Sequence, residues 1–507
     1  MVVIVDGSPL TIEDVVAVAH RTADVETGPN LAARMEPARA LVEQIIANDD
    51  VAYGITTGFG ALSYTRIPVE QASELQYDLV RSHASGVGDL LDRPAVRAML
   101  LLRSRTLAQG YSGVRPAIVE RLIEFLQRDL LPAVPDRGSV GASGDLAPFA
   151  HLALPLIGEG FFLVGGQRVP AGEVLVAEGL EPIALEPKEG LSLLNGTEGM
   201  LAQGCLAVHA ARLLADASDA ACALSVEALM GSSRPFQDRI HQLRPHPGQI
   251  HSAAVIAGLL DGSMIGASHR DDFSHRVQDA YSLRCAPQVH GSVRDTIDHA
   301  AAVFERELGA VVDNPIVFAE DGDVISAGNF HGQPLAFALD FLSIAVTELG
   351  SISERRTDRI LDPERSYGLS PFLATRPGVD SGYMLAQYTA AALVAENRVL
   401  SHPASVESIP TSGSQEDHVS MGWGAAMKLR DVLRNTAYVI AVELVCGAQG
   451  CDQRAPLVPA AGTKAILDAV RTVVPPLVAD RPVGADIESA AQLIEDGEIT
   501  AAMHRRE

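Results

Sequence analysis

Small residues gather between Arg137 and Pro148, and this stretch is where the sequence offers the most chemistry. Ala142, Ser143 and Gly144 lie at its centre, so a hydroxyl side chain stands between two small neighbours. Glycine lets a chain fold sharply and approach another group closely. The pattern therefore predicts a loop in which the backbone around Ser143 approaches itself.

Two ordinary interpretations of this stretch compete. In the first, Ser143 is the attacking hydroxyl of a nucleophile elbow, but that pattern needs a glycine two residues after the serine. Asp145 stands there instead, which disfavours a hydrolase. In the second, Asp145 caps a helix whose first turn tolerates Pro148. Ala-Ser-Gly alone does not exclude this second interpretation, so the decision depends on the rest of the chain.

The stretch resembles the prosthetic-group loop of the histidine and aromatic amino acid ammonia-lyases. In that family the segment cyclises: the nitrogen matching Gly144 attacks the carbonyl matching Ala142, and two waters are lost, one with the serine hydroxyl. The resemblance implies that Ala142, Ser143 and Gly144 form a 4-methylidene-imidazol-5-one autocatalytically, an electrophile able to accept an amine. No Gly-rich loop ending in Lys-Ser/Thr is found, so no nucleotide cofactor is expected.

A second candidate site lies in residues 53–60, which read Tyr-Gly-Ile-Thr-Thr-Gly-Phe-Gly. The glycines interrupt any helix or central strand, so a mobile loop carrying Tyr53 is predicted. Alone, Tyr53 would more often be a half-buried packing residue. The stretch looks like the ammonia-lyase loop that covers the active site, and this resemblance gives Tyr53 the role of general base.

His83 lies near the end of a helix predicted from Leu75 to Gly88. A lone histidine at a helix end is usually a cap or a packing residue. In the family, the matching position contacts the ring of the substrate. The pair Ser82-His83 resembles the histidine-specific members, whereas the tyrosine-specific relatives tend to have His-Leu.

Asn195 precedes a long apolar stretch from Met200 to Met230. Five titratable residues interrupt that stretch, which would be costly in lipid, so a buried core helix is predicted rather than a membrane span. Asn195 could simply cap this helix. The family match makes it a contact to the electrophile or to the substrate.

Residues 276–291 resemble the family segment whose arginine binds the substrate carboxylate, and Arg284 stands at that position. A guanidinium presents a planar fork suited to a carboxylate, although an arginine taken alone is most often a surface ion-pair residue. The same match implies that Gln278 contacts the substrate and that Tyr281 is catalytic, as the alternative base. Ala280 departs from the family, which usually has proline there.

Three more residues complete the site that the resemblance implies. Phe330 borders the substrate, although it would otherwise be a packing aromatic in a helix-entry turn, and Met384 lines the pocket. Glu416 lies near the substrate imidazole. Glu416, Asp417 and His418 also suggest a metal site, but three adjacent positions cannot all face one ion on a regular helix or strand. No metal is therefore expected.

The remaining pattern is mainly helical. Thr11 and Asp14 are placed like a helix-capping pair, and a small hairpin is predicted between Phe161 and Ala184. Helical periodicity is predicted over 95–109, 116–128, 200–230, 335–361, 384–400 and 425–445. The resemblance implies a mostly α fold, with a long-helix bundle over 198–507 and a smaller N-terminal lobe over 1–197 that carries the tyrosine loop and the electrophile.

The chain of 507 residues has a formal net charge of -25. Binding of phosphates needs basic patches, which we do not find, so nucleic acid and anionic membranes are not expected as partners. The five cysteines are scattered, and the chain does not begin with a charged and apolar signal segment. We therefore expect reduced thiols in a cytoplasm.

Family motifs recur in the family order from Tyr53 to beyond Glu416, which is more specific than any one motif. The resemblance implies a homotetramer with shared active sites that removes ammonia from L-histidine to give trans-urocanate. An aromatic amino acid ammonia-lyase or an aminomutase of the same family is the alternative. A non-catalytic helical scaffold would explain the bundle but not the recurring polar residues.

Overall fold

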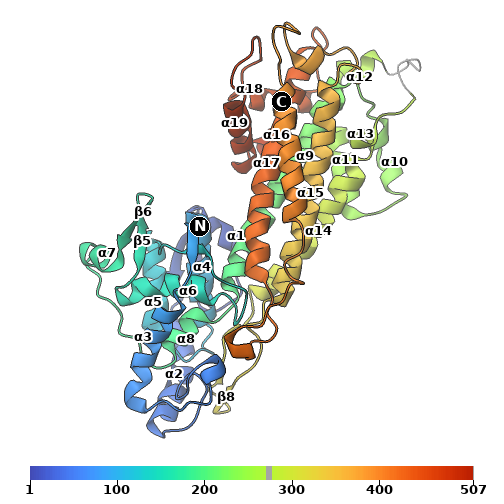
Figure 1. Ribbon diagram of the computed structural model, residues 1–507. Coiled ribbons are helices and arrows are strands. Elements are labelled where there is room, and N and C mark those ends of the chain that lie inside the picture. Colours follow the sequence, from blue (N-terminus) through green and yellow to red (C-terminus); the bar gives the residue numbers. More distant parts are fainter. Residues whose placement is uncertain (270–276, 506–507) are drawn as a thin grey trace. The chain divides into compact units, whose positions relative to one another are not determined.

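The computed structural model describes residues 1–269 and 277–505 of the chain (Figure 1). Over these residues it contains twenty α-helices and eight short strands. The strands pair two by two into four separate ribbons, of which only β1–β2 is parallel. The prediction of a mostly α fold is confirmed.

The chain forms two compact units. Unit 1 comprises 1–206, 301–340 and 403–427, and unit 2 comprises 207–300, 341–402 and 428–507. These units differ from a division at residue 197, because two later segments of the chain belong to unit 1. Four long helices contribute to both units: α9 (Glu198–Ala228), α14 (Ala286–Glu307), α15 (Gln333–Leu361) and α17 (Gly422–Asp452).

Unit 1 holds all eight strands of the described residues. It also holds the shorter helices of the first 200 residues. Its elements are β1 (Val2–Val5), α1 (Ile12–Ala19), β2 (Asp24–Thr27), α2 (Leu31–Ala47), α3 (Ala72–His83), β3 (Val87–Leu90), α4 (Arg93–Leu107), α5 (Pro116–Gln127), β4 (Pro135–Arg137), α6 (Leu146–Ala153), β5 (Phe161–Val164), β6 (Gln167–Pro170), α7 (Ala171–Glu178), α8 (Glu189–Leu194), β7 (Ile316–Phe318) and β8 (Asp323–Ile325).

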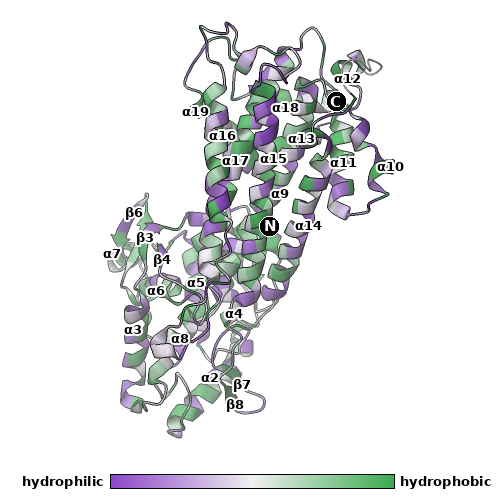
Figure 2. Cartoon of the chain, turned by 45° about the vertical axis from the view of Figure 1, so that its right-hand side comes forward, coloured by the Kyte–Doolittle hydropathy of each residue, from purple (hydrophilic) through white to green (hydrophobic). Residues whose placement is uncertain are grey.

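Unit 2 is a helix bundle in which the long helices lie side by side (Figure 1). Gly450 of α17 packs so closely on α9 that a Cβ built there would lie 2.7 Å from the Cβ of Ala228. Hydrophobic and hydrophilic residues alternate along α14 to α17 (Figure 2), as expected for helices with one covered face. The other helices of this unit are α10 (Asp238–His241), α11 (Pro247–Leu259), α12 (Met264–Ser268), α13 (Tyr281–Arg284), α16 (Met384–Leu400), α18 (Ala461–Arg471), α19 (Gly484–Glu495) and α20 (Glu498–Met503).

Several local predictions are confirmed. Thr11 and Asp14 form a capping box, because the Asp14 N–H donates to Thr11 Oγ1 at 3.1 Å and the Thr11 N–H donates to Asp14 Oδ2 at 3.0 Å. The hairpin is β5–β6, although it is followed by α7 within the predicted range. The helix predicted over 384–400 has those bounds, as α16.

One helix in the described part of the chain, α15, is long and apolar enough to cross a membrane by length and composition. Within its apolar window, 61% of the residues are buried, which is also the behaviour of a core helix in a soluble protein. The helix predicted to be a buried core element, α9, is covered along most of its length.

Candidate active site

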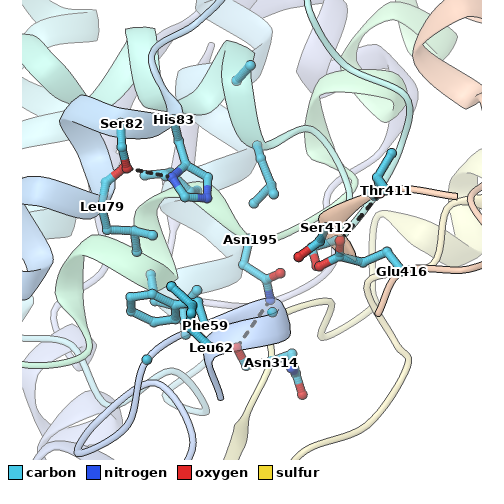
Figure 3. Close-up of a pocket in the computed structure, with 18 of the residues that line it drawn as sticks. Phe59, Leu62, Leu79, Ser82, His83, Asn195, Asn314, Thr411, Ser412 and Glu416 are labelled. Carbon is cyan, nitrogen blue, oxygen red and sulfur yellow. Dashed lines mark hydrogen bonds between the residues drawn. The ribbon is translucent and has the colours of Figure 1, made fainter. Parts of the chain in front are cut away.

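A cavity of about 640 Å³ lies within unit 1 (Figure 3). The fold brings six separate segments of the chain to its wall. Six of the predicted site residues line it, namely Tyr53, His83, Ala142, Ser143, Asn195 and Glu416. The sequence motifs that follow one another along unit 1 thus converge on one space.

The Ala-Ser-Gly loop joins β4 to α6 and turns sharply. Ser143 has a φ of +51°, in the left-handed region that a serine rarely adopts, and Gly144 has a φ of +80°. The Gly196 N–H donates to Ser143 O at 3.1 Å, and the Asp145 N–H donates to Gly196 O at 2.8 Å. A Cβ built on Gly144 would lie 1.9 Å from Gly196 O, so only glycine fits at that position.

This geometry fits the cyclised group that the family resemblance implies. Ring closure needs a sharp turn at the serine and a glycine after it, and the loop has both. The bridge to Gly196 is made by Ser143 O and Asp145 N, so it does not engage the Gly144 nitrogen. Ser143 also lines the cavity, where a substrate amine could reach it.

Asp145 occupies the N-cap position of α6, but its side chain does not cap that helix. Its side chain makes no capping bond to α6 and instead accepts a hydrogen bond of 2.7 Å from the Met200 N–H, in the first turn of α9. The predicted cap is therefore correct in position but not in its side-chain bond, because the carboxyl group meets an N–H of a helix distant in sequence. Burial raises the pKa of Asp145 to about 7.

Tyr53 is half-buried in its loop. The Gly60 N–H donates to Tyr53 Oη at 3.3 Å, and the Phe59 ring packs edge-on at a centroid distance of 6.3 Å. Burial raises the pKa of Tyr53, Glu416 raises it further, and the Gly60 N–H only partly opposes this. At neutral pH the phenol of this chain is therefore protonated, and a role as base requires further activation.

His83 and Glu416 face the same cavity (Figure 3). Burial lowers the pKa of His83, so its imidazole is neutral near pH 7, and Nδ1 lies 3.1 Å from Ser82 Oγ. The Thr411 N–H donates to Glu416 O at 2.9 Å, which closes a short loop around the carboxylate. That loop packs on the tyrosine loop, since a Cβ at Gly60 would lie 3.3 Å from Glu416 Oε1.

Asn195 is buried, and its amide nitrogen has two partners. Nδ2 donates to Asp313 Oδ1 at 3.2 Å and to Asn314 O at 3.3 Å. Because α9 begins at Glu198, the N-cap position of that helix falls on Thr197, and Asn195 is not its N-cap residue. Its Oδ1 is left on the cavity side (Figure 3).

The other six predicted site residues do not line the cavity. Phe330 and Gly144 belong to unit 1 but do not line the cavity, and the remaining four, Gln278, Tyr281, Arg284 and Met384, belong to unit 2. The Arg284 guanidinium lies 4.5 Å from the centroid of the Tyr281 ring, and Nε donates to Asp279 O at 2.9 Å. Its terminal nitrogens make no hydrogen bond to another described residue. The roles of these residues stay predictions.

Sequence reasoning did not identify Asp313, Asn314 or Ser412 as part of this region. Asn314 and Ser412 line the cavity, and Asp313 holds Asn195. Ser412 could have been found from its place four residues before Glu416, but no pattern marked Asp313. In the described part of the chain, no group of three or more His, Cys, Asp or Glu side chains is placed to hold a metal ion.

The comparisons with known proteins show that this mostly helical chain is a carbon–nitrogen lyase. The model of the aromatic amino acid lyases matches residues 10–472. The chain is 51% identical over 500 residues to a histidine ammonia-lyase of Gloeobacter violaceus, covering 99% of this chain and 97% of that one.

Comparison with solved structures points to the same kind of enzyme. Tyrosine aminomutase from Streptomyces globisporus has a TM-score of 0.95 at 42% identity, with coverage of 99% of this chain and 98% of that one. Histidine ammonia-lyase from Trypanosoma cruzi has a TM-score of 0.91 at 41% identity, with coverage of 99% and 95%. The chain belongs to the aromatic amino acid lyase family.

Proposed function

We propose that this protein is a histidine ammonia-lyase, which converts L-histidine to trans-urocanate and ammonia in the first step of histidine degradation. The observation that carries the proposal is the shared cavity of Ser143, His83 and Glu416. An imidazole ring offers one donor and one acceptor, and the two polar side chains can pair with both. The curated relatives at about half identity support the same substrate.

Ala142, Ser143 and Gly144 would hold the prosthetic group as 4-methylidene-imidazol-5-one, whose formation the tight turn at Ser143 favours. Once formed, this group supplies an electrophile that takes up the substrate amine and makes it a better leaving group. The chain's own residues do the rest. Tyr53 removes the β-proton as general base, and Asn195 contacts the reacting end of the substrate.

Arg284 binds the substrate carboxylate in this proposal, with Gln278, Tyr281 and Met384 close to it. All four lie in unit 2, whereas the cavity lies in unit 1. From the family resemblance, we propose a homotetramer in which a second copy of the chain completes each site. Exposed apolar side chains on α15 and α16 support association of helices between copies, namely Phe341, Ile344, Leu385, Tyr388 and Val399.

Two further parts of the proposal concern the binding partner and the cellular location of the enzyme. The partner is a small-molecule substrate, and the negative net charge disfavours nucleic acid and anionic membranes. A cytoplasmic location is proposed from the five cysteines, none of which forms a disulfide in the described part of the chain.

An aminomutase is the second candidate, because tyrosine aminomutase is a near structural match. The deciding experiment gives the purified enzyme L-histidine, L-tyrosine and L-phenylalanine separately. Ultraviolet absorbance measures the unsaturated acid, and chromatography measures any β-amino acid. Urocanate as the dominant product supports the proposal, whereas a β-amino acid as the main product identifies a mutase.

The prosthetic group has its own test. Intact-mass analysis is expected to give a chain lighter by two waters, roughly 36 Da, as the covalent-catalysis proposal requires. The control is Ser143→Ala, which has no hydroxyl to eliminate and is expected to keep its fold, its unmodified mass and almost no activity. An unmodified mass in fully active wild type would contradict the proposed group.

A further inference from the structure

A buried ion pair lies directly behind Asn195. Lys188 Nζ is 2.9 Å from Asp313 Oδ2, and both side chains are fully covered. Ser192 Oγ completes the cluster, since it accepts from Lys188 Nζ and donates to Asp313 Oδ2, both at 2.8 Å. The other carboxylate oxygen, Asp313 Oδ1, accepts from Asn195 Nδ2.

The choice of a lysine at this position is unusual for the chain. Of its 39 basic residues only three are lysines, Lys188, Lys428 and Lys464, and Lys188 is the fully buried one. An ammonium group is a compact point charge with three donors. It can therefore serve a carboxylate and a hydroxyl that are crowded together, where the wider guanidinium fork would need more space.

The ion pair fixes which chemical groups face Asn195. Burial alone would raise the pKa of Asp313, but Lys188 holds it below its usual value, so Asp313 is ionised. An ionised carboxylate and a backbone carbonyl are both acceptors without a donor. Because Asp313 Oδ1 and Asn314 O both face the amide of Asn195, only Nδ2 can point toward them.

We propose that Lys188 and Asp313 are positioning residues, which hold the Asn195 amide with its Oδ1 facing the cavity. Asn195 thereby presents an acceptor, and the group on an amino acid substrate that needs an acceptor is its α-ammonium. Without the ion pair, the amide can rotate and present its NH₂ group, which repels that ammonium. This inference rests on the proposed function, because it requires an amino acid in the cavity.

The test replaces both charges together, as Lys188→Met with Asp313→Asn, so that neither charge is left buried alone. The new amide at 313 offers a donor as well as an acceptor, so Asn195 can face it either way. We expect kcat/KM for L-histidine to fall about tenfold to a hundredfold, the range for a lost hydrogen bond to a charged group. Intact mass must still show the modified loop.

A substrate analogue without the amino group separates positioning from general damage. 3-(Imidazol-4-yl)propanoate keeps the ring and the carboxylate but gives Asn195 nothing to accept. Its inhibition constant is expected to stay unchanged in the double variant while histidine use falls. If both weaken by the same factor, the ion pair merely supports the fold and the inference is overturned.

A double-mutant comparison tests whether the pair acts through Asn195. In an Asn195→Ala background, the Lys188→Met and Asp313→Asn changes should cause no further loss, whereas independent, multiplying losses would overturn the inference. Lys464→Met, which breaks the exposed pair with Asp468, is the matched control and should keep wild-type kinetics. If the double variant does not fold, Ser192→Ala removes one donor to Asp313 without removing a charge, and the same readouts apply.

Failure of the proposed function would give a different result from failure of the positioning inference. In that case wild type itself would not produce urocanate from histidine. If wild type prefers tyrosine, the comparison is repeated with tyrosine and its analogue without the amino group, and the inference about Asn195 is tested with the same criteria.

Discussion

The backbone of Gly144 lies against the carbonyl of Gly196, so that a Cβ built on Gly144 would be 1.9 Å from that oxygen. Neither partner can move freely, because the Gly196 N–H and carbonyl are both bonded to the residues that flank Gly144. The two glycines therefore hold the Ala-Ser-Gly loop against the residues that precede α9.

Gly144→Ala is expected to displace this loop and to abolish both cyclisation and activity, as measured by intact mass and by urocanate formation. Gly179→Ala is the matched control. Gly179 also has a positive φ, of +68°, but nothing lies within 4 Å of a Cβ built there. It should cost about 1–2 kcal/mol of stability through backbone strain alone and leave the loop chemistry intact. Normal cyclisation in Gly144→Ala would contradict the contact with Gly196.

Tyr53→Phe should lower turnover by about 10²- to 10⁴-fold, the usual contribution of a general base, while the loop keeps its modified mass. Because burial raises the pKa of Tyr53, the reactive phenolate is scarce at neutral pH and increases as the pH rises. Wild-type kcat should therefore increase toward alkaline pH, and this increase should be absent in the variant. Turnover close to wild type would transfer the role of base to another residue, with Tyr281 the first candidate.

Replacing His83 by Leu and Glu416 by Gln should reduce kcat/KM for histidine by about tenfold to a hundredfold for each lost polar contact. The reason is that the imidazole donor or acceptor is then left without a partner. Loop cyclisation should be unaffected, and phenylalanine or tyrosine should gain relative to histidine. The measurement is kcat/KM for all three amino acids, and an unchanged preference for histidine would remove both residues from substrate selection.

Mixing two inactive variants tests whether the active sites are shared between subunits. Ser143→Ala removes the electrophile, and Arg284→Lys removes the fork that binds the carboxylate. Dissociated and reassembled together, they should recover part of the activity, because some sites in mixed tetramers contain both intact residues. Each variant reassembled alone is the control. No recovery in proven mixed tetramers would place Ser143 and Arg284 of each site on the same chain.

Asp145→Asn should change how stability depends on pH. The folded pKa of Asp145, about 7, lies above the unfolded value of about 4, so the folded state holds a proton that the unfolded state has released. This contribution to stability is fully present below about pH 4 and is lost as the pH rises to about 7. The free energy of unfolding of wild type, minus that of the variant, should decrease over this range in denaturant titrations. An increase over the same range would show that the buried group is ionised.

Several local elements could be predicted from the sequence because signals close together in the chain determine them. The Thr11–Asp14 capping box needs only residues three apart, and α16 has its predicted bounds because its periodicity is uninterrupted. The small residues around Ser143 predicted a chain that approaches itself. The structure gives this approach a specific partner in Gly196, which the sequence did not indicate.

The rest depends on contacts between segments far apart in the chain. Asp145 looks like the cap of α6, but its carboxyl group binds the Met200 N–H, 55 residues further on. Asn195 looks like the cap of α9, but its amide faces Asp313, 118 residues further on. Both are polar side chains next to a helix start, and sequence pattern cannot tell which N–H group or carboxylate each will meet.

The four helices that belong to both units determine whether the gene could be divided between the units. The path passes from one unit to the other within α9, α14, α15 and α17, and once more after α16. A gene fragment that encodes one unit would have to end or begin in the middle of a helix at four of these places. Neither unit is therefore a contiguous gene segment that could be excised and expressed by a single pair of cuts.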